Sequence, residues 1–266
     1  MTYSVHTKVN WIQRISSNWE DFFYPSLIKK INKSNSYFDE LFSFKVTTIK
    51  TINDANEFLL LYDKEIASRK NYIFKKNEQK EILDNKIQGG KNYLLASLYK
   101  KDSGKFAGGI IFHILEDKLF FYLRAFDKEI RTSFRSLTTL DFWAEREMYE
   151  YAFSQGLKFI SHGTDNYPNK GRTGLVLFKL KVGGKPRISK KEHEILELSD
   201  EQILEFGIPT FIWTNPDKES FFQKAHLFYK EGSLDESVLT ELIKVCQWAK
   251  IELILHKTQE TANDDC

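Results

Sequence analysis

Apolar positions along the middle of the chain alternate between the period of a strand and the period of a helix. Residues 44–50 form a run rich in β-branched side chains, which predicts a strand. Apolar residues then recur at helical spacing over 55–66, and Asp54 and Glu57 ahead of them have the spacing of a capping box. A more polar helix is expected over 77–88, because Gly89-Gly90 follows it directly.

Three further strands are expected over 92–99, 106–115 and 119–126, with short polar turns between them. Turns of this length predict an antiparallel meander. An apolar stripe from Leu140 to Ala152 then indicates a helix that ends at Gly156.

A strand over 157–162, a short helix over 174–182 and an extended stretch from Pro186 complete this region. The order β-α-α-β-β-β-α-β-α-β predicts an α/β protein with a mixed sheet and helices on both faces.

The flanking regions differ from this pattern. Residues 1–43 are aromatic and helical in pattern, with breaks near Pro25 and 34–36, and are expected to form an N-terminal helical extension. Residues 192–266 are acidic and are expected to form a C-terminal α/β subdomain. Its expected elements are strands over 210–214 and 251–256, helices over 217–229 and 234–250, and a disordered last ten residues. The central domain therefore spans 44–191.

Composition narrows the class of protein. Charged residues make up 29% and hydrophobic residues 41% of the chain, which favours a folded soluble protein. Two cysteines exclude a disulfide framework, and no stretch has the roughly 20 apolar residues of a membrane span. We therefore expect a cytoplasmic protein, and the composition indicates no oligomeric state.

Charge is spread unevenly, although the net charge is only +2. Residues 166–191 carry eight Lys and Arg and no acidic residue, whereas acidic residues dominate from Glu192 onward. The basic run fits either an ordinary solvated face or a site for an anion, such as a phosphate-bearing cofactor or an RNA end. Zinc spacing, a phosphate-binding Gly-Lys loop and a dinucleotide fingerprint are absent from the sequence.

Four segments of the sequence resemble segments of a known protein superfamily. Residues 106–112, Phe-Ala-Gly-Gly-Ile-Ile-Phe, resemble the central strand of the GNAT superfamily, and 119–126 resemble the strand that leads into its cofactor loop. Residues 156–163, followed by 174–183 with its Phe178-Lys179 pair, are similar to the FemAB-like, acetyltransferase-6-type branch. The resemblance covers about 145 of 266 residues.

The resemblance implies an N-acyltransferase with a GNAT-like fold. Such an enzyme moves an acyl or aminoacyl group to an amine acceptor by direct attack, and the acceptor could be a small molecule, a peptide or a cell-wall precursor. No tightly bound cofactor and no metal is implied. The donor is either acyl-CoA as a co-substrate or an aminoacyl-tRNA, which makes tRNA a candidate partner.

The loop at 131–138 departs from the coenzyme A pattern. GNAT enzymes that use coenzyme A usually carry a Gly-rich turn there, whose backbone N–H groups hold the pyrophosphate. Here the loop has no glycine, and the residues expected to hold donor phosphates are Arg131, Ser133, Arg135 and Ser136. FemAB-like enzymes do not need that turn, so the departure fits them better.

Candidate chemistry follows from acyl transfer, which needs an oxyanion donor and groups that move protons. The resemblance places the oxyanion donor in the backbone at Leu123, Arg124 and Ala125. Strand alternation puts Tyr122 and Arg124 on one face, where Tyr122 can protonate a leaving group and Arg124 can hold a carboxylate or phosphate. A half-exposed face with polar tips is the plainer interpretation.

His162 and Asp165 flank Gly163 at the end of a strand and could act as a general base with its orienting carboxylate. A turn histidine capped by Asp165 is the alternative. Substrate contacts are expected from the neighbouring loop and helix, through Tyr167, Lys170, Arg172 and Lys179. The resemblance places Lys179 near the acyl donor, whereas its helical position also fits a solvent-facing lysine.

A different class of function stays open beside the enzyme. A non-catalytic protein of the GNAT fold, recognising an anionic ligand or a partner, would show the same degenerate phosphate loop. Nucleic-acid binding through 166–191 is the third hypothesis, and it predicts a steep loss of affinity with salt.

Overall fold

The computed structural model describes residues 1–67, 77–133, 140–170, 173–189 and 193–258. The chain falls into two compact units. Arg14–Ser161 form what we call the central unit, and Met1–Gln13 with His162–Cys266 form the terminal unit. These units cross the three-part division expected from composition, which stays a prediction.

The central unit is built on the meander that the sequence predicted. Its strands are β3 (Phe42–Ile49), β4 (Tyr93–Lys100), β5 (Phe106–Leu115) and β6 (Lys118–Phe126), each antiparallel to the next. The start of β7 (Phe159–Asn166) pairs with β6 in parallel, from Lys118–Phe159 to Phe120–Ser161. The sheet is therefore mixed, as expected.

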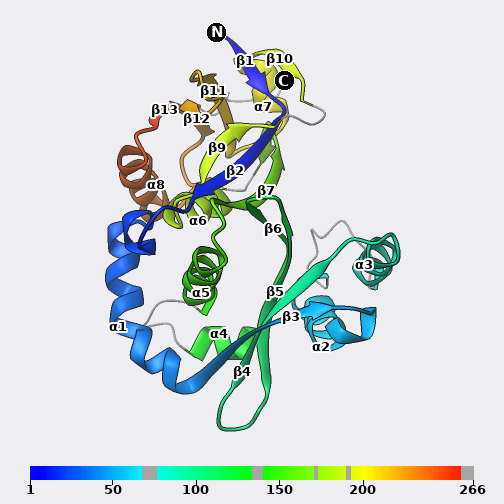
Figure 1. The fold of residues 1–266 in the computed structure, drawn as a ribbon. Coiled ribbons are helices and arrows are strands. Elements are labelled where there is room, and N and C mark those ends of the chain that lie inside the picture. Colours follow the sequence, from blue (N-terminus) through cyan, green and yellow to red (C-terminus); the bar gives the residue numbers. More distant parts are fainter. Residues whose placement is uncertain (68–76, 134–139, 171–172, 190–192, 259–266) are drawn as a thin grey trace, which may run out of the picture. The chain divides into compact units, whose positions relative to one another are not determined.

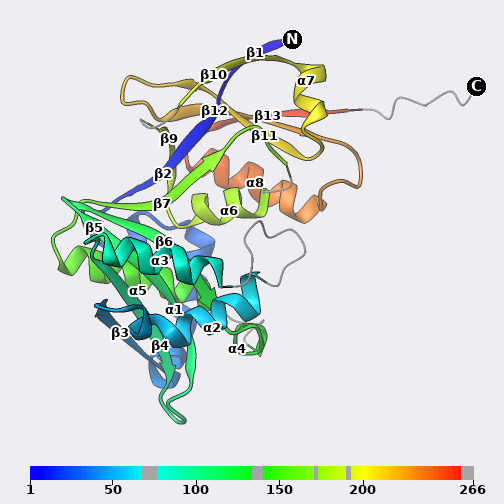
Figure 2. The ribbon, with the colours of Figure 1, turned by 90° about the vertical axis from the view of Figure 1, so that its right-hand side faces the viewer.

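Helices cover both faces of this sheet. Figures 1 and 2 show α1 (Pro25–Leu41) and α5 (Leu140–Ser154) on one face, and α2 (Asn56–Tyr62) and α3 (Glu78–Gln88) on the other. The short helix α4 (Lys128–Ser133) follows β6. The α2–α3 face holds a hydrophobic core that includes Phe58, Leu83 and Ile111. The mixed α/β architecture with helices on both faces is thus confirmed.

The terminal unit carries the second half of β7, with β2 (Lys8–Arg14) and β9 (Lys185–Ile188) as its successive neighbours. A second sheet has the order β13-β12-β11-β8, and β1 pairs with β10. The remaining elements of this unit are β1 (Thr2–His6), β8 (Asn169–Lys170), α6 (Thr173–Lys181), β10 (Ile195–Ser199), α7 (Asp200–Glu205), β11 (Thr210–Pro216), β12 (Phe222–Tyr229), α8 (Glu236–Trp248) and β13 (Glu252–Lys257).

The expected N-terminal helix is wrong for the first 14 residues, which form β1 and β2. Burial alternates along both strands, with Val5, Val9 and Trp11 buried between more exposed neighbours. That period of two is the strand signal that the aromatic content of the segment obscured. The helix expected further on does form, and it begins with Pro25 at its first position, where a missing N–H costs nothing.

The helix expected over 217–229 is also wrong, because β12 occupies most of it. This strand lies between β11 and β13, so its residues from Ala225 to Phe228 are all buried and show no alternation. A short, continuously apolar run of this kind cannot be assigned by periodicity. Strand β10 and helix α7 were not predicted, whereas β11, α8 and β13 confirm their predictions.

One cap differs from expectation. The capping box joins Thr51 and Asp54, not Asp54 and Glu57, and the Asp54 carboxylate accepts the backbone N–H of Lys50 at 2.9 Å and of Thr51 at 2.8 Å. In the described part of the chain no helix is long and apolar enough to cross a membrane.

Candidate functional site

A buried ion pair in the terminal unit joins two of the predicted site residues. Lys179 Nζ donates to Asp165 Oδ2 at 2.7 Å, and the side chains are 6% and 7% exposed. The indole N–H of the fully buried Trp11 donates to the same oxygen at 2.7 Å. Lys179 Nζ also lies 5.4 Å from the centroid of the Trp11 ring. The interpretation of Lys179 as a solvent-facing helix residue is therefore wrong.

Local structure explains why Lys179 is held so firmly. Gly183, with φ +81°, ends α6 in a left-handed conformation, its N–H donates to Leu180 O and the N–H of Gly184 donates to Lys179 O. A Cβ at Gly184 would lie 2.8 Å from Lys179 O. Only glycine permits this close approach, so the Gly183-Gly184 pair fixes the end of the helix that carries Lys179.

The ion pair has a definite electrostatic meaning. Burying an ammonium and a carboxylate costs several kcal/mol per ion, roughly, unless each is paired and hydrogen-bonded. Asp165 meets that requirement with one cationic and one neutral donor. A buried ion pair is weak evidence for stability. Buried charged groups with a specific partner are also common at functional sites, so Lys179 and Asp165 are candidates for a functional role.

His162 lies on the same strand as Asp165 but has another described partner. Its Nε2 lies 3.0 Å from Gln13 Oε1, and the imidazole is 8% exposed. The Gln13 amide nitrogen is buried without a hydrogen-bond partner among the described residues. Strand β2 thus supplies Trp11 to Asp165 and Gln13 to His162. A role of Asp165 in orienting His162 stays a prediction.

The other predicted substrate residues of this unit are only partly described. Tyr167 is buried, and its ring centroid lies 6.3 Å from that of Trp213. The backbone of Lys170 lies in β8, which pairs with β11. Arg172 lies outside the described residues.

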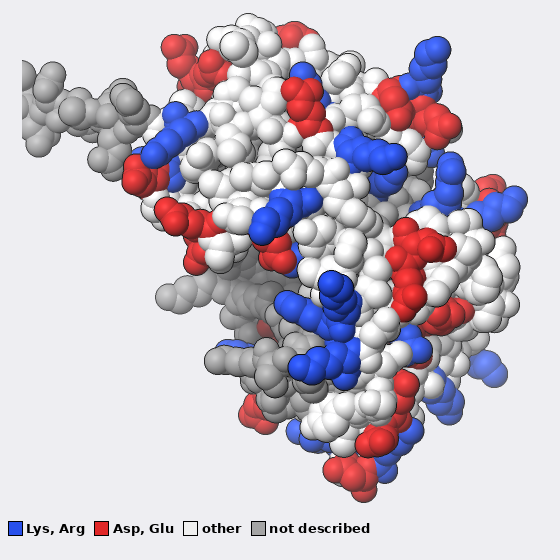
Figure 3. Space-filling model, turned by 90° about the vertical axis from the view of Figure 1, so that its left-hand side faces the viewer, with Lys and Arg blue, Asp and Glu red and all other residues white. Residues whose placement is uncertain are grey.

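Tertiary structure supplies the acids that the basic run 166–191 lacks. Lys179 pairs with Asp165, and Lys181 Nζ lies 2.5 Å from Glu241 Oε1 on α8. Arg187 donates from Nε to the backbone oxygen of Glu219 at 3.1 Å. Two of the eight basic side chains of the run are therefore paired with carboxylates of the same unit. On the face drawn in Figure 3, side chains of both signs are interspersed.

A bulge in β6 marks the candidate site of the central unit. Along the β5–β6 ladder Phe112 pairs with Phe121 and Ile111 pairs with Leu123, so Tyr122 is one extra residue in the register of β6. Bulges of this kind disrupt the ladder locally and redirect side chains, and they are common beside active sites. The residues predicted to carry the oxyanion donor, Leu123 to Ala125, follow it directly.

The bulge overturns the prediction that Tyr122 and Arg124 share a face. Tyr122 and Leu123 both pack with the α2–α3 core, and the Tyr122 hydroxyl donates to Gln79 Oε1 on α3 at 3.2 Å. Arg124 lies on the α5 side, where its guanidinium pairs with Glu145. An extra residue shifts the alternation by one, so the two side chains point to opposite sides of the sheet.

Glu145 is almost completely buried, at 1% exposed. Burial raises the pKa of its carboxyl, and the neighbouring Arg124 guanidinium opposes that rise. Arg124 therefore already binds an internal carboxylate. A substrate carboxylate or phosphate would have to compete with Glu145 for the Arg124 guanidinium.

The turn after β6 is where an acyl donor's phosphates were expected. The Asp127 carboxylate accepts the backbone N–H of Glu129 at 2.9 Å and of Ile130 at 3.1 Å, so it caps the start of α4. The backbone of Arg131 and Ser133 belongs to α4. Arg135 and Ser136 lie outside the described residues. The first N–H groups after β6 are thus occupied by an acidic side chain.

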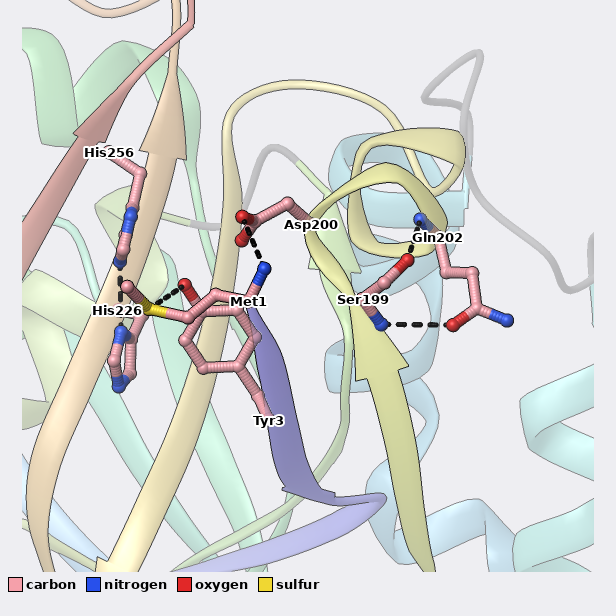
Figure 4. A network of polar contacts seen from close by, with 7 residues as sticks. All are labelled: Met1, Tyr3, Ser199, Asp200, Gln202, His226 and His256. Atoms are coloured by element: carbon pink, nitrogen blue, oxygen red, sulfur yellow. Dashed lines mark hydrogen bonds and ion pairs between the residues drawn. The ribbon is translucent and has the colours of Figure 1, made fainter.

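An aromatic and polar network in the terminal unit was not predicted. Figure 4 shows Tyr3 of β1 beside His226 and His256, with their ring centroids 4.8 Å and 5.8 Å from that of Tyr3. His226 Nδ1 lies 2.9 Å from His256 Nε2. Burial, helped by His256 and Lys224, lowers the pKa of His226 to about 4, and burial with the Asp200 carboxylate raises that of Tyr3 to about 12. No sequence motif indicated this network, because its members come from four separate elements.

No protein-family model and no curated protein matches this sequence. Among solved structures, the crystal structure of FemX is similar over 75% of this chain, with a TM-score of 0.50 and 10% identity. A C-terminal domain of a putative lysylphosphatidylglycerol synthetase from Agrobacterium fabrum matches over 76% of this chain, with a TM-score of 0.44 and 14% identity. A tandem GNAT protein from the clavulanic acid biosynthesis pathway matches over 70%, with a TM-score of 0.37 and 8% identity.

These matches cover 63%, 64% and 52% of the three known chains, so this chain spans less than two thirds of their length. At such identities the likeness concerns the fold, and function has to be argued from the site. The fold of this chain is similar to that of FemX, as the FemAB-like resemblance of the sequence predicted.

Proposed function

We propose that this protein transfers an acyl or aminoacyl group from an activated donor to an amine. The amine nitrogen attacks the donor carbonyl carbon, the bond to the leaving thiol or ribose oxygen breaks, and a proton passes from the amine to the leaving group through the protein. The observation that carries the proposal is the bulge at Tyr122. Leu123–Ala125 pair with β5 on one side, and within the central unit the pairing of β6 with β7 ends at Phe120. We therefore place the backbone oxyanion donor on the side of Leu123–Ala125 that faces away from β5.

The proton-handling groups we assign are Tyr122 and His162. Tyr122 protonates the leaving group, and His162 accepts the proton of the amine. Lys179, held by Asp165 and Trp11, is the residue that the FemAB-like resemblance assigns to the acyl donor. Tyr167, Lys170 and Arg172 contact the acceptor.

The capping of α4 by Asp127 bears on the donor. A carboxylate on the N–H groups of Glu129 and Ile130 takes the place that a pyrophosphate would need. Together with the glycine-free loop at 131–138, this supports an aminoacyl-tRNA over acyl-CoA. Arg131, Ser133, Arg135 and Ser136 then hold phosphates of the tRNA end. A small molecule, a peptide or a cell-wall precursor with a free amine serves as acceptor.

A donor assay tests the proposal directly. The purified protein is incubated with a panel of amine acceptors and either acetyl-CoA or charged tRNA, and the acceptors are analysed by mass spectrometry. We expect an aminoacyl mass increment with charged tRNA. An acetyl increment instead would overturn the choice of donor, and no increment with either donor would favour a non-catalytic binding protein. That second candidate is supported by the burial of His162 and the internal pairing of Asp165.

Two matched pairs of variants test the residues. Tyr122→Phe should lower kcat by about 100-fold if its hydroxyl moves a proton. The control Tyr99→Phe, on β4, removes a hydroxyl that donates to Glu57 of α2 and should leave kcat unchanged. Lys179→Met should abolish transfer, whereas Lys181→Met removes a charge two residues along the same helix and should not. Equal losses within either pair would contradict the assigned roles.

A further inference from the structure

Three side chains that can carry positive charge lie near the Tyr93 and Tyr122 rings on the α2–α3 face of the central unit, where the Tyr93 ring lies 5.4 Å from both the Tyr122 ring and the His113 ring. Lys86 lies in the last turn of α3, Lys91 follows that helix and His113 lies on β5. Lys86 Nζ sits 4.0 Å from the centroid of the Tyr122 ring. The His113 ring stacks on Phe120 with centroids 5.0 Å apart and an interplanar angle of 8°. Aromatic contacts thus hold two of the three groups in place.

The end of α3 fixes the third group. Gly90, at φ +80°, donates its N–H to Ile87 O at 2.9 Å, and the N–H of Lys91 donates to Lys86 O at 3.1 Å. This pair of bonds is a Schellman motif, which ties Lys91 to the backbone of Lys86. The negative end of the α3 dipole accounts for two lysines here. It does not account for the half-burial of Lys86 over an aromatic ring or for the nearby His113.

These groups repel one another without a described counter-charge. Burial lowers the pKa of Lys86, and Lys91 lowers it further. Burial also lowers the pKa of His113, with Lys91 and Lys86 as the next causes. Among the described residues, neither lysine forms an ion pair with an acidic side chain. Converging like charges that lack an internal carboxylate are what an anion-binding site requires.

We propose that Lys86, Lys91 and His113 form a binding site for the phosphate group of a phosphorylated ligand. A phosphate dianion offers three strong acceptor oxygens to three donors on α3, the α3–β4 connection and β5. A bound anion opposes the repulsion from the two lysines, so binding raises the pKa of His113 and favours its protonated form. The site does not depend on acyl transfer, because it is defined by binding alone.

Isothermal titration of the full chain with inorganic pyrophosphate tests this site. Lys86→Gln and Lys91→Gln should each weaken binding by about ten-fold, because each removes a charged donor. Lys45→Gln is the matched control, since it removes an exposed lysine of β3 in the same unit. Lys91 is exposed, so its variant reports on binding without a loss of folding.

The imidazole signal of His113 gives a second readout. Its NMR titration should move to higher pH when pyrophosphate is bound, while acetate at the same ionic strength should leave it unchanged. Equal weakening by Lys45→Gln or an unmoved His113 titration would each overturn the site. Because no acyl donor is present, these outcomes are separate from the fate of the proposed reaction.

Discussion

Each unit contains an ion pair between a basic side chain and a buried carboxylate, and the two pairs differ in how far the basic side chain is exposed to solvent. In the terminal unit, Asp165 accepts from both Lys179 and Trp11, and both members of the ion pair are buried. In the central unit, Glu145 is buried but its partner Arg124 is 30% exposed, and burial raises the Glu145 pKa despite the guanidinium. Both charged side chains of the first pair are shielded from solvent, whereas in the second pair the Arg124 guanidinium stays in contact with solvent.

The largest expected effect comes from breaking the fully buried pair. Asp165→Ala removes the described carboxylate of a buried ammonium and should lower the free energy of unfolding by about 3–5 kcal/mol, measured by urea denaturation. The double variant Asp165→Ala/Lys179→Met should recover most of that loss, since no buried charge remains. Glu145→Ala should cost less than Asp165→Ala, because Arg124 reaches water. A larger loss for Glu145→Ala would invert the comparison.

Acidification should act on the two units in opposite directions. His226 in the terminal unit has a pKa lowered from 6.5 to about 4, so the unfolded chain binds more protons. The stability that its neutral form confers is present above pH 6.5 and decreases as the pH falls towards 4, by about 2 kcal/mol at pH 5. Hydrogen exchange of β12 and β13 should report this loss. It should be absent in His226→Gln, and a pH-independent β12 would contradict the prediction.

Glu145 in the central unit has the opposite sign. Its raised pKa means that the folded protein binds the proton more tightly, so its contribution is fully present below pH 4.5 and lost as the pH rises through the folded pKa. The stability of the wild type relative to Glu145→Gln should therefore grow on acidification. Denaturation of both proteins from pH 7 to 5 measures the difference, and a difference that shrinks would show that Arg124 outweighs burial.

The smallest expected effect isolates the second donor to Asp165. Trp11→Phe keeps an aromatic ring against Trp213, whose centroid lies 5.4 Å away, but removes the indole N–H. The loss should be about 1 kcal/mol, the usual net value of one hydrogen bond. Trp19→Phe, a buried tryptophan of the central unit, serves as the comparison for ring size. If Trp11→Phe has no effect beyond Trp19→Phe, the ion pair with Lys179 suffices to hold Asp165.

A residue of the candidate site could be predicted only where the pattern of its own helix or strand singled it out. Lys179 was singled out by its place in a Phe-Lys helix, and Tyr122 by its place on β6. The bulge that separates Tyr122 from Arg124 was not predictable, because it depends on how β6 pairs with β5 and not on β6 alone. The partners of Asp165 and His162 were missed because Trp11 and Gln13 were assigned to a helix.

The sequence by itself determined the mixed α/β class and most elements between β3 and β9, since the apolar period, turns and glycines that define each of them lie within a short segment. The short elements α4 and β8 were not predicted. Tertiary structure alone decided which polar side chains of all these elements contact one another. Trp11 reaches Asp165 across 154 residues of sequence, and Gln13 reaches His162 across 149. No local pattern encodes such a pairing, because burial and charge compensation are properties of the folded neighbourhood, which forms only when the N-terminal strand β2 lies beside β7.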